Sequence, residues 1–188
     1  MKIRIAGRIC ESIVDGPGLR YVLFTQGCPR SCLGCHNPQT HDLKGGIEVT
    51  TEKILEEISS NPLLSGVTFS GGEPFIQANA LIELARKIKH RDLNLVIYTG
   101  YTWEELHEVN NKDWNTLLEE ADVLVDGPFI QKLHSWNLKF TGSSNQRIID
   151  IRRSLVSGKP IELASLDHIP NNNEKYCRGD YNDGVIRR

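Results

Sequence analysis

Residues 66–74 read Gly66-Val67-Thr68-Phe69-Ser70-Gly71-Gly72-Glu73-Pro74, a short apolar run that ends in a pair of glycines. The β-branched and aromatic residues of this run predict a strand, and the glycines permit a tight turn after it. Similar runs lie at residues 21–25, 93–98 and 121–125, and we expect these strands to be mostly buried on both faces. Because helical patterns separate the later runs, the chain predicts βαβ units and a parallel sheet.

The expected helices follow Thr50-Thr51, run through residues 78–88, begin at the capping box of residues 102–105, and cover residues 114–120. Their apolar positions are Ile54, Leu55, Ile58, Ala78, Leu81, Ile82, Ala85, Ile88, Leu106 and Val109. A complete eight-unit barrel usually needs around 250 residues, and this chain has 188. We therefore expect an α/β fold, a partial and open TIM-like barrel of about six βα units. It would occupy residues 1–166, and the polar residues 167–188 would form a loose strap or a disordered tail.

Three cysteines, Cys28, Cys32 and Cys35, follow the first of these strands at offsets of four and three. Thiolates at this spacing let one tight loop wrap a soft metal centre. Three thiolates on a four-iron cluster leave one iron without a protein ligand, whereas ferredoxin-type runs supply cysteines to every iron. An open iron can bind a substrate or cofactor, so the spacing indicates chemistry rather than simple electron transfer.

A structural zinc site is the alternative for this loop, with Cys10, His36 or Cys177 as the fourth ligand. Structural zinc sites normally use two separate C-x2-4-C hooks, or a C-x2-C with a separate H-x3-5-H pair. This chain has no second cysteine hook, and its histidines at this spacing, His36 and His41, follow Cys35 directly. Cys10 and Cys177 are otherwise expected to be a core thiol and a tail thiol.

Each motif follows a strand: the cysteine loop, the Gly71-Gly72 turn, Thr99-Gly100, and Asp126-Gly127-Pro128. The carboxyl ends of parallel strands meet at one edge of a sheet, where ligands gather. We expect a binding site at this edge. Other interpretations stay open: the glycines as an ordinary turn, Thr99 as an ordinary strand end, and Asp126 as a cofactor ligand, a cation ligand or a cap.

The cysteine loop and the GGEP turn together resemble the radical S-adenosylmethionine (SAM) enzymes. The chain is most similar to the glycyl-radical activating enzymes, in particular to those that activate anaerobic ribonucleoside-triphosphate reductases. The segments that carry this closer resemblance are Asp15-Gly16-Pro17-Gly18-Leu19-Arg20, Asp126-Gly127-Pro128-Phe129 and Gly142-Ser143-Ser144-Asn145-Gln146-Arg147. It runs from about residue 3 to residue 151. The superfamily often has an aromatic residue before the third cysteine. This chain has Gly34 there, a glycine that the reductase activases share. After Cys35 it has His36, where many reductase activases have tyrosine.

The resemblance implies a radical SAM domain with a 4Fe–4S cluster on the three cysteines and SAM as the second cofactor. The turn at Gly71, Gly72 and Glu73 would hold the methionine part of SAM around its amino group. Backbone at Gly34 would contact the adenine, with the side chain of His36 beside it, although a partly exposed loop histidine is the other interpretation. The complete implied set of SAM-binding residues is Gly34, Cys35, His36, Gly71, Gly72, Glu73, Thr99 and Asp126.

The implied reaction is reductive cleavage of SAM to a 5′-deoxyadenosyl radical, which abstracts a glycine Cα hydrogen from the reductase. Flavodoxin or ferredoxin would supply the electron, and no catalytic residue is expected beyond the cluster and the cofactor. The loop at residues 142–147 and the polar tail would lie at the mouth through which the reductase glycine enters. Two alternatives remain: a radical SAM enzyme that acts on a small molecule, such as a carboxy-deazaguanine synthase, and a non-catalytic iron–sulfur or zinc module.

Composition limits the partners and the compartment. A net charge of −2 and a pI near 6.3 give no electrostatic reason to expect nucleic acid. No apolar run approaches the roughly 18 residues of a membrane span, and the charged N-terminus does not resemble a signal peptide. An odd number of cysteines without a secretion signal argues against disulfides. We therefore expect a cytoplasmic protein with reduced thiols.

Overall fold

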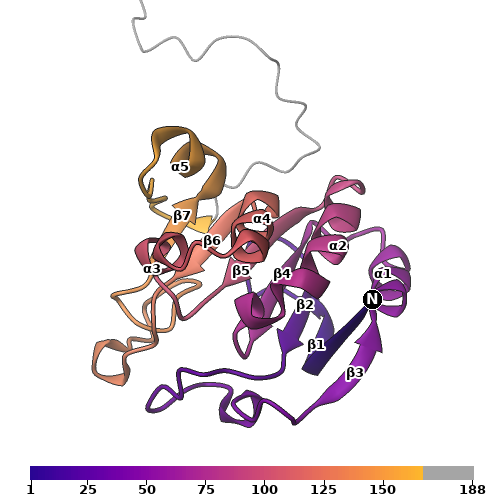
Figure 1. Ribbon diagram of the computed structural model, residues 1–188, viewed down its shortest axis with the longest axis horizontal. Helices are drawn as coiled ribbons and strands as arrows, with labels where there is room; N and C mark the ends of the chain where they lie inside the picture. The colour runs from indigo at the N-terminus through magenta and orange to yellow at the C-terminus, as the bar shows by residue number, and fades with distance from the viewer. Residues whose placement is uncertain (167–188) are drawn as a thin grey trace, which may run out of the picture.

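The computed structural model describes residues 1–166, which form one mixed sheet with helices packed against it (Figure 1). The expected strap or tail at residues 167–188, which includes Cys177, lies outside the described residues. The strands are β1 (Lys2–Ser12), β2 (Arg20–Thr25), β3 (Ile47–Thr50), β4 (Gly66–Gly71), β5 (Asn94–Tyr98), β6 (Val123–Asp126) and β7 (Arg147–Asp150). The helices are α1 (Thr51–Ser59), α2 (Ala78–Lys89), α3 (Trp103–Glu108), α4 (Lys112–Glu120) and α5 (Ile151–Ser157). Short 3-10 turns cover Pro38–Thr40, Pro74–Gln77 and Gln131–Leu133.

The sheet has the strand order β3-β1-β2-β4-β5-β6-β7 and is open. The four strands β2, β4, β5 and β6 are parallel, as the sequence predicts. β1 pairs antiparallel with both β2 and β3, and β7 pairs antiparallel with β6. The α/β class is therefore confirmed, while the expectation of parallel pairing throughout the sheet is wrong for the outer strands.

Two helices begin where the sequence places their caps, whereas α4 begins two residues earlier than expected and α5 was not predicted. The Thr50 side chain accepts a hydrogen bond from the Lys53 amide at the start of α1. Thr102 and Glu105 form the expected capping box of α3. Another detail is wrong: Val109 is 53% exposed, because α3 ends at Glu108 before this residue can reach the core.

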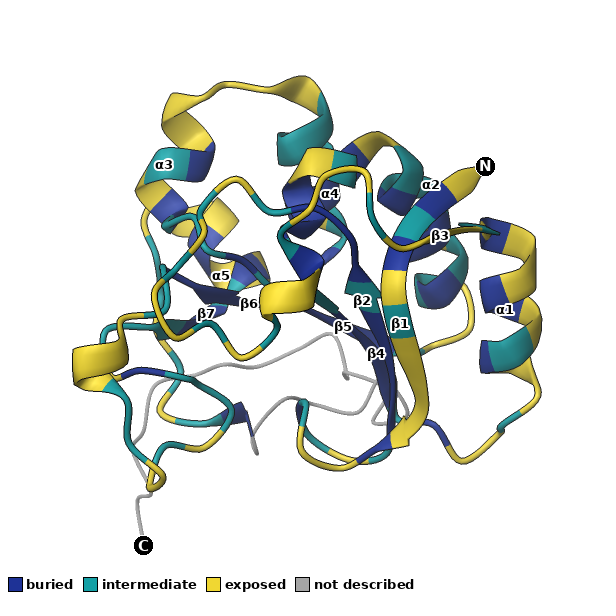
Figure 2. Cartoon of the chain, turned by 90° about the horizontal axis from the view of Figure 1, so that it is seen from below, coloured by how far each residue is buried: buried dark blue, intermediate teal, exposed yellow. Residues whose placement is uncertain are grey.

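Both faces of the parallel strands are covered, as Figure 2 shows by the dark colour of β2, β4 and β5. On one face, Leu23, Phe69 and Ile97 belong to the hydrophobic core that includes α1, α2 and α4. Successive residues of a strand point to opposite faces. The next residue of each strand therefore points to the other face and lines a cavity there: Phe24, Ser70 and Tyr98.

Arg20 anchors the amino-terminal half of the parallel strands. It is fully buried, and its guanidinium donates hydrogen bonds to Thr68 Oγ1 (2.7 Å), Asn94 Oδ1 (2.6 Å) and the Val67 carbonyl (2.6 Å). Since its donors are used within the sheet, the arginine of the DGPG-x-R segment has a structural role. Among residues 1–166, no helix is long and apolar enough to cross a bilayer.

Candidate functional site

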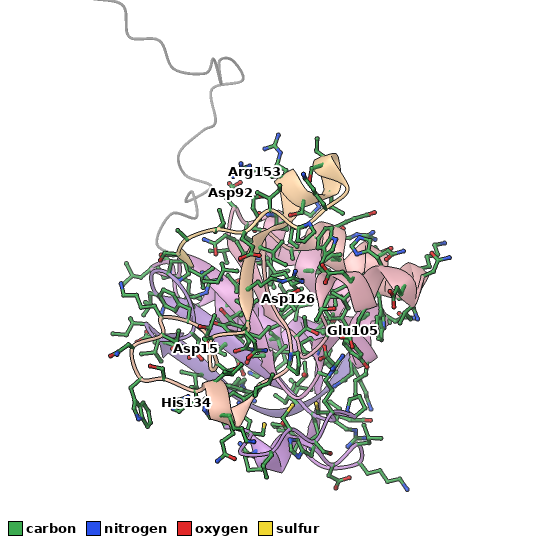
Figure 3. The ribbon with its side chains drawn as sticks, turned by 90° about the vertical axis from the view of Figure 1, so that its left-hand side faces the viewer. Asp15, Asp92, Glu105, Asp126, His134 and Arg153 are labelled. Carbon is green, nitrogen blue, oxygen red and sulfur yellow. The ribbon has the colours of Figure 1, made fainter. Side chains whose placement is uncertain are left out.

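A cavity of about 580 Å³ lies at the carboxyl ends of β2, β4 and β5. Cys28, Cys32 and Cys35 all line it. The other sequence-predicted residues that line it are His36, Gly71, Gly72 and Thr99. The site thus brings together three loops that follow three adjacent parallel strands. Its wall is completed by residues from the DGPG loop and from the β6–β7 connection, among them Asp15 and His134, which Figure 3 labels.

Backbone hydrogen bonds shape the cysteine loop. The Gly27 amide donates to the Thr40 carbonyl (2.8 Å), and the Cys35 amide donates to the Cys32 carbonyl (3.1 Å). Gly34 has a φ of 72°, a conformation that glycine adopts without strain. A Cβ at this position would meet the side chain of Gln131 at 2.8 Å. Gln131 therefore occupies the space that the aromatic residue of the superfamily would need.

All three thiols of the cysteine loop line one cavity. Among residues 1–166, no group of three histidine, cysteine or acidic side chains converges to hold one metal ion, as a structural zinc would require. The expectation that Cys10 is a core thiol is wrong: it lies on the exposed part of β1 and does not line the cavity. Thiolates of a four-iron cluster bind separate irons of one cluster, so three thiols that line the same cavity fit the expected cluster. Burial raises the pKa of the Cys28 thiol above its usual value, and metal coordination deprotonates a thiol outright.

The glycine pair holds the strand end against the base of the cysteine loop. Gly71 has a φ of 95°. A Cβ at Gly72 would lie 2.2 Å from the carbonyl oxygen of Gly27, the residue before Cys28. The Gly72 amide donates to the Thr25 carbonyl (2.8 Å), and the Glu73 amide donates to the Gly27 carbonyl (2.8 Å). This turn therefore positions the cysteine loop as well as lining the cavity.

Glu73 is fully buried and does not line the cavity. Its carboxylate accepts hydrogen bonds from the Gly100 amide (2.8 Å), the Thr99 hydroxyl (2.8 Å) and the Phe75 amide (3.2 Å). The carboxylate therefore joins the ends of β4 and β5. The structure places its oxygens on protein donors, so a direct bond to the SAM ammonium stays a prediction.

Burial raises the pKa of Glu73 to about 7, and the hydrogen bonds from Gly100, Thr99 and Phe75 lower it less than burial raises it. The folded protein therefore holds this proton more tightly than the unfolded chain, where the pKa is near 4.5. The resulting stabilisation is fully present below about pH 4.5 and is lost as the pH rises through about 7. The difference corresponds to about 3 kcal/mol.

We expect the free energy of unfolding of the iron-free protein to fall between pH 5 and pH 8, and Glu73→Gln to flatten that fall. Urea unfolding at each pH measures both chains. Equal slopes in the wild type and the variant would show that Glu73 does not titrate in this range.

Asp126 lies behind the site rather than in it. It is 1% exposed and does not line the cavity. It accepts hydrogen bonds from the Trp103 amide (2.7 Å) and from Arg147 Nε (3.0 Å) and Nη2 (2.5 Å). Arg147 also pairs with Glu104. Of the three interpretations left open by the sequence, the structure supports the cap, because this carboxylate binds the first amide of α3.

Hydrogen bonds to earlier residues of the β6–β7 connection hold the loop at residues 142–147. The Ser143 hydroxyl accepts a bond from the Ile130 amide (3.1 Å), and the Asn145 amide group donates to the Pro128 carbonyl (2.8 Å). Gly142 and Gln146 of this loop do line the cavity. The donors that the sequence offers here therefore hold the β6–β7 connection in place.

Aromatic rings line the cavity beside the cysteine loop, and some of them could not be anticipated from the sequence. The exposed His36 ring lies 4.7 Å from the Phe129 ring and 5.5 Å from the His134 ring, between centroids. Trp136, which is 92% exposed, packs on His134 at 4.9 Å and also lines the cavity. These rings offer stacking surfaces for a planar ligand. Only two of these rings stood out in the sequence: His36 after Cys35, and Phe129 at the end of the Asp126-Gly127-Pro128-Phe129 segment.

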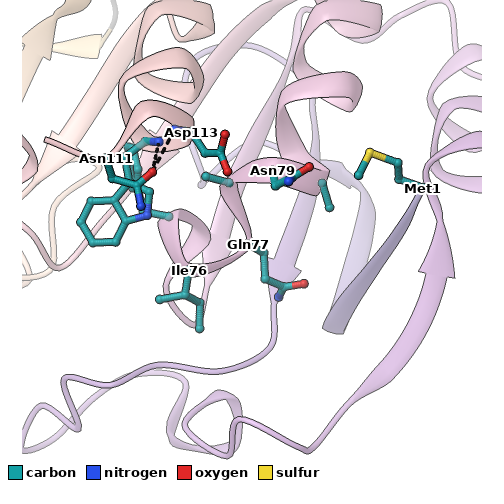
Figure 4. Close-up of a pocket in the computed structure, with 10 residues that line it drawn as sticks. Met1, Ile76, Gln77, Asn79, Asn111 and Asp113 are labelled. Atoms are coloured by element: carbon teal, nitrogen blue, oxygen red, sulfur yellow. Dashed lines mark hydrogen bonds between the residues drawn. The ribbon is translucent and has the colours of Figure 1, made fainter. Parts of the chain in front are cut away.

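A second hollow of about 330 Å³ lies between Met1 and the start of α4 (Figure 4). Its lining includes Gln77, Asn79, Asn111 and Asp113, and it contains no thiol. The cavity with three cysteines is therefore the candidate site. Its size falls within the range of roughly 300–1,000 Å³ for small-molecule sites.

Three thiols at the edge of an open α/β sheet, beside a cavity for a small molecule, define an iron–sulfur protein with a ligand site. Residues 14–149 match the model of a family described as a 4Fe-4S single cluster domain. The chain is 38% identical over 144 residues to the anaerobic ribonucleoside-triphosphate reductase-activating protein of Vibrio cholerae, covering 72% of this chain and 90% of that protein. The Haemophilus influenzae protein of the same name is 31% identical over the same shares.

The pyruvate formate-lyase-activating enzyme of Staphylococcus epidermidis is 36% identical over 78% of this chain, which spans only 60% of that enzyme. The chain therefore belongs to the radical SAM family of glycyl-radical activating enzymes. Its cofactors are a 4Fe–4S cluster and SAM.

Proposed function

We propose that this protein generates the glycyl radical of an anaerobic ribonucleoside-triphosphate reductase. The observation that carries the proposal is the three-cysteine cavity in a chain that spans 90% of a reductase-activating protein. The similarity to pyruvate formate-lyase activases is nearly as high, but this chain spans only 60% of the one from Staphylococcus epidermidis. The reductase is therefore the better supported partner.

Cys28, Cys32 and Cys35 would hold the cluster, and one iron would remain for SAM. Together the two cofactors supply one-electron chemistry that removes a hydrogen atom from a C–H bond. The backbone at Gly72 and Thr99 would hold the methionine part of SAM. Backbone at Gly34 and the ring of His36 would receive the adenine, with Phe129 beside them.

The protein's own task is positioning and exclusion of water, because no acid–base residue is needed for hydrogen abstraction. We propose that the sheet is a partial barrel whose open side lies at this cavity. Residues 1–166 would form one catalytic domain. A glycine of the reductase would enter past the loop at residues 142–147. Flavodoxin or ferredoxin would supply the electron in the cytoplasm.

The reduced protein, mixed anaerobically with SAM and the reductase, is expected to give a doublet in electron paramagnetic resonance (EPR), the signal of a glycyl radical. Substituting alanine for the reductase glycine should abolish the doublet, since alanine replaces the reacting centre. With this reductase variant, slow SAM cleavage that is not coupled to hydrogen abstraction is expected to persist, because the cofactor site of the activating protein is unchanged.

A doublet with pyruvate formate-lyase and none with the reductase would show that pyruvate formate-lyase, and not the reductase, is the partner. If neither protein gives a radical, yet a purine-derived small molecule stimulates SAM cleavage, the small-molecule alternative is correct.

A further inference from the structure

Arg30 lies inside the cysteine loop, between Cys28 and Cys32, and is the one arginine or lysine among the described residues that line the cavity. Its guanidinium forms an ion pair with Glu105 and lies over the Tyr101 ring, 4.4 Å from the centroid. Its Nε atom is buried without a hydrogen-bond partner. The side chain therefore leaves its own loop and packs on the segment after β5, where Gly100 forms another wall of the cavity.

That wall is the connection between β5 and α3. The stem of Arg30 lies against Gly100, where a Cβ would meet Arg30 Cδ at 2.7 Å. Any side chain at position 100 would displace the arginine. The absence of a side chain at Gly100 thus lets the cysteine loop approach the end of β5.

The contact continues to the GGEP turn. The Gly100 amide donates to Glu73 (2.8 Å), and Glu105 also accepts a bond from the Thr102 amide (2.8 Å). Arg30 is therefore a side-chain link, in addition to the backbone bond from Glu73 to Gly27, between the cysteine loop and the segment that joins the two strand ends.

We propose that Arg30 is a positioning residue that fixes the cluster-bearing loop at the correct distance from the SAM-binding edge. The proposal rests on the cofactors of the family and is independent of which protein is activated. Arg30 and Glu105 are partly exposed, at 21% and 43% of their side chains, so their pairing contributes little to global stability. Misplacement of reacting groups by about 1 Å can reduce a rate on the order of 100-fold.

The test compares Arg30→Gln, Arg30→Lys and Glu105→Gln with Arg8→Gln. Arg8 forms a similarly exposed ion pair with Glu57 away from the cavity, which makes it a matched control. Glutamine at position 105 keeps an oxygen for the Thr102 amide, so the cap of α3 survives. Iron content, SAM affinity, and the EPR spectrum of the reduced cluster with and without SAM are measured.

Arg30→Gln and Glu105→Gln are expected to keep about four irons per chain and an unchanged spectrum without SAM. Their SAM affinity should fall about tenfold or more, and the change that SAM produces in the spectrum should be weakened. Arg30→Lys should be intermediate, since lysine keeps the charge but loses the planar stacking on Tyr101. Arg8→Gln should match the wild type.

Wild-type SAM affinity and spectra in both Arg30→Gln and Glu105→Gln would overturn the proposal, as would an equal loss in Arg8→Gln. If Arg30→Gln fails to hold iron, Glu105→Gln decides, because it leaves the cysteine loop unaltered. Failure of the wild-type protein to activate the reductase would refute the proposed partner and leave this inference standing.

Discussion

Alanine at Cys28, Cys32 or Cys35 is expected to reduce the iron content from about four atoms per chain to nearly none. Each of these thiols lines the cavity, and the other cysteine in the described chain, Cys10, is exposed on β1 and outside it. Among the described residues, no other thiolate is therefore placed to replace the one removed. Anaerobic reconstitution followed by iron and sulfide analysis measures the loss, and SAM cleavage should disappear with the cluster.

Cys10→Ser is the control and should keep both iron and activity. Cys177→Ser, outside the described residues, should do the same. A stable, fully loaded Cys32→Ala protein, or an iron-free Cys177→Ser protein, would contradict the assignment of the ligands.

The central strands were predictable because burial on both faces leaves a nearly continuous apolar run. This applies to β2, β4, β5 and β6, whose residues are mostly buried. Their parallel order then placed the motif at each carboxyl end along one edge of the sheet. The edge location of the site followed from this topology alone.

The outer strands were not predicted, because they are short or partly exposed and so lack a continuous apolar run. In β1, Ile3 and Ile5 are buried, but most of the residues that follow them are exposed. Charged residues such as Arg4 and Arg8 also interrupt its apolar pattern. β3 and β7 have only four residues each. Short, partly exposed strands carry too little pattern to be distinguished from loops, and their antiparallel pairing depends on partners elsewhere in the chain.

Within the site, the sequence identified reactive residue types but not their partners. Glu73 and Asp126 are carboxylates at strand ends, as expected, yet each binds donors of the protein from a distant segment: Gly100 for Glu73, and Trp103 and Arg147 for Asp126. Spacing along the chain cannot show which donor binds a carboxylate in the folded protein. The packing of the β6–β7 connection against the cysteine loop was hidden for the same reason.

Gly72→Val is expected to remove SAM binding and to impair the cluster together. The valine Cβ would lie 2.2 Å from the Gly27 carbonyl oxygen and 3.0 Å from the Thr25 carbonyl oxygen. Both are backbone atoms, which cannot move aside as a flexible side chain can. The strand end or the base of the cysteine loop must therefore shift, and the hydrogen bonds from Gly72 to Thr25 and from Glu73 to Gly27 would be strained or broken.

We expect the SAM affinity of Gly72→Val to fall about 100-fold or more, equivalent to about 2.7 kcal/mol, and iron occupancy to fall with it. Gly7→Val is the matched control, because a Cβ at that β1 position meets no atom within 4 Å. Reconstituted iron and SAM affinity are measured for both variants. Loss of SAM binding with full iron would mean that the side chain only blocks the ligand, whereas loss of both would mean that the glycine is required to seat the metal-binding loop. Unchanged values for both would show that the strand end has room for a side chain and that the turn does not position the site.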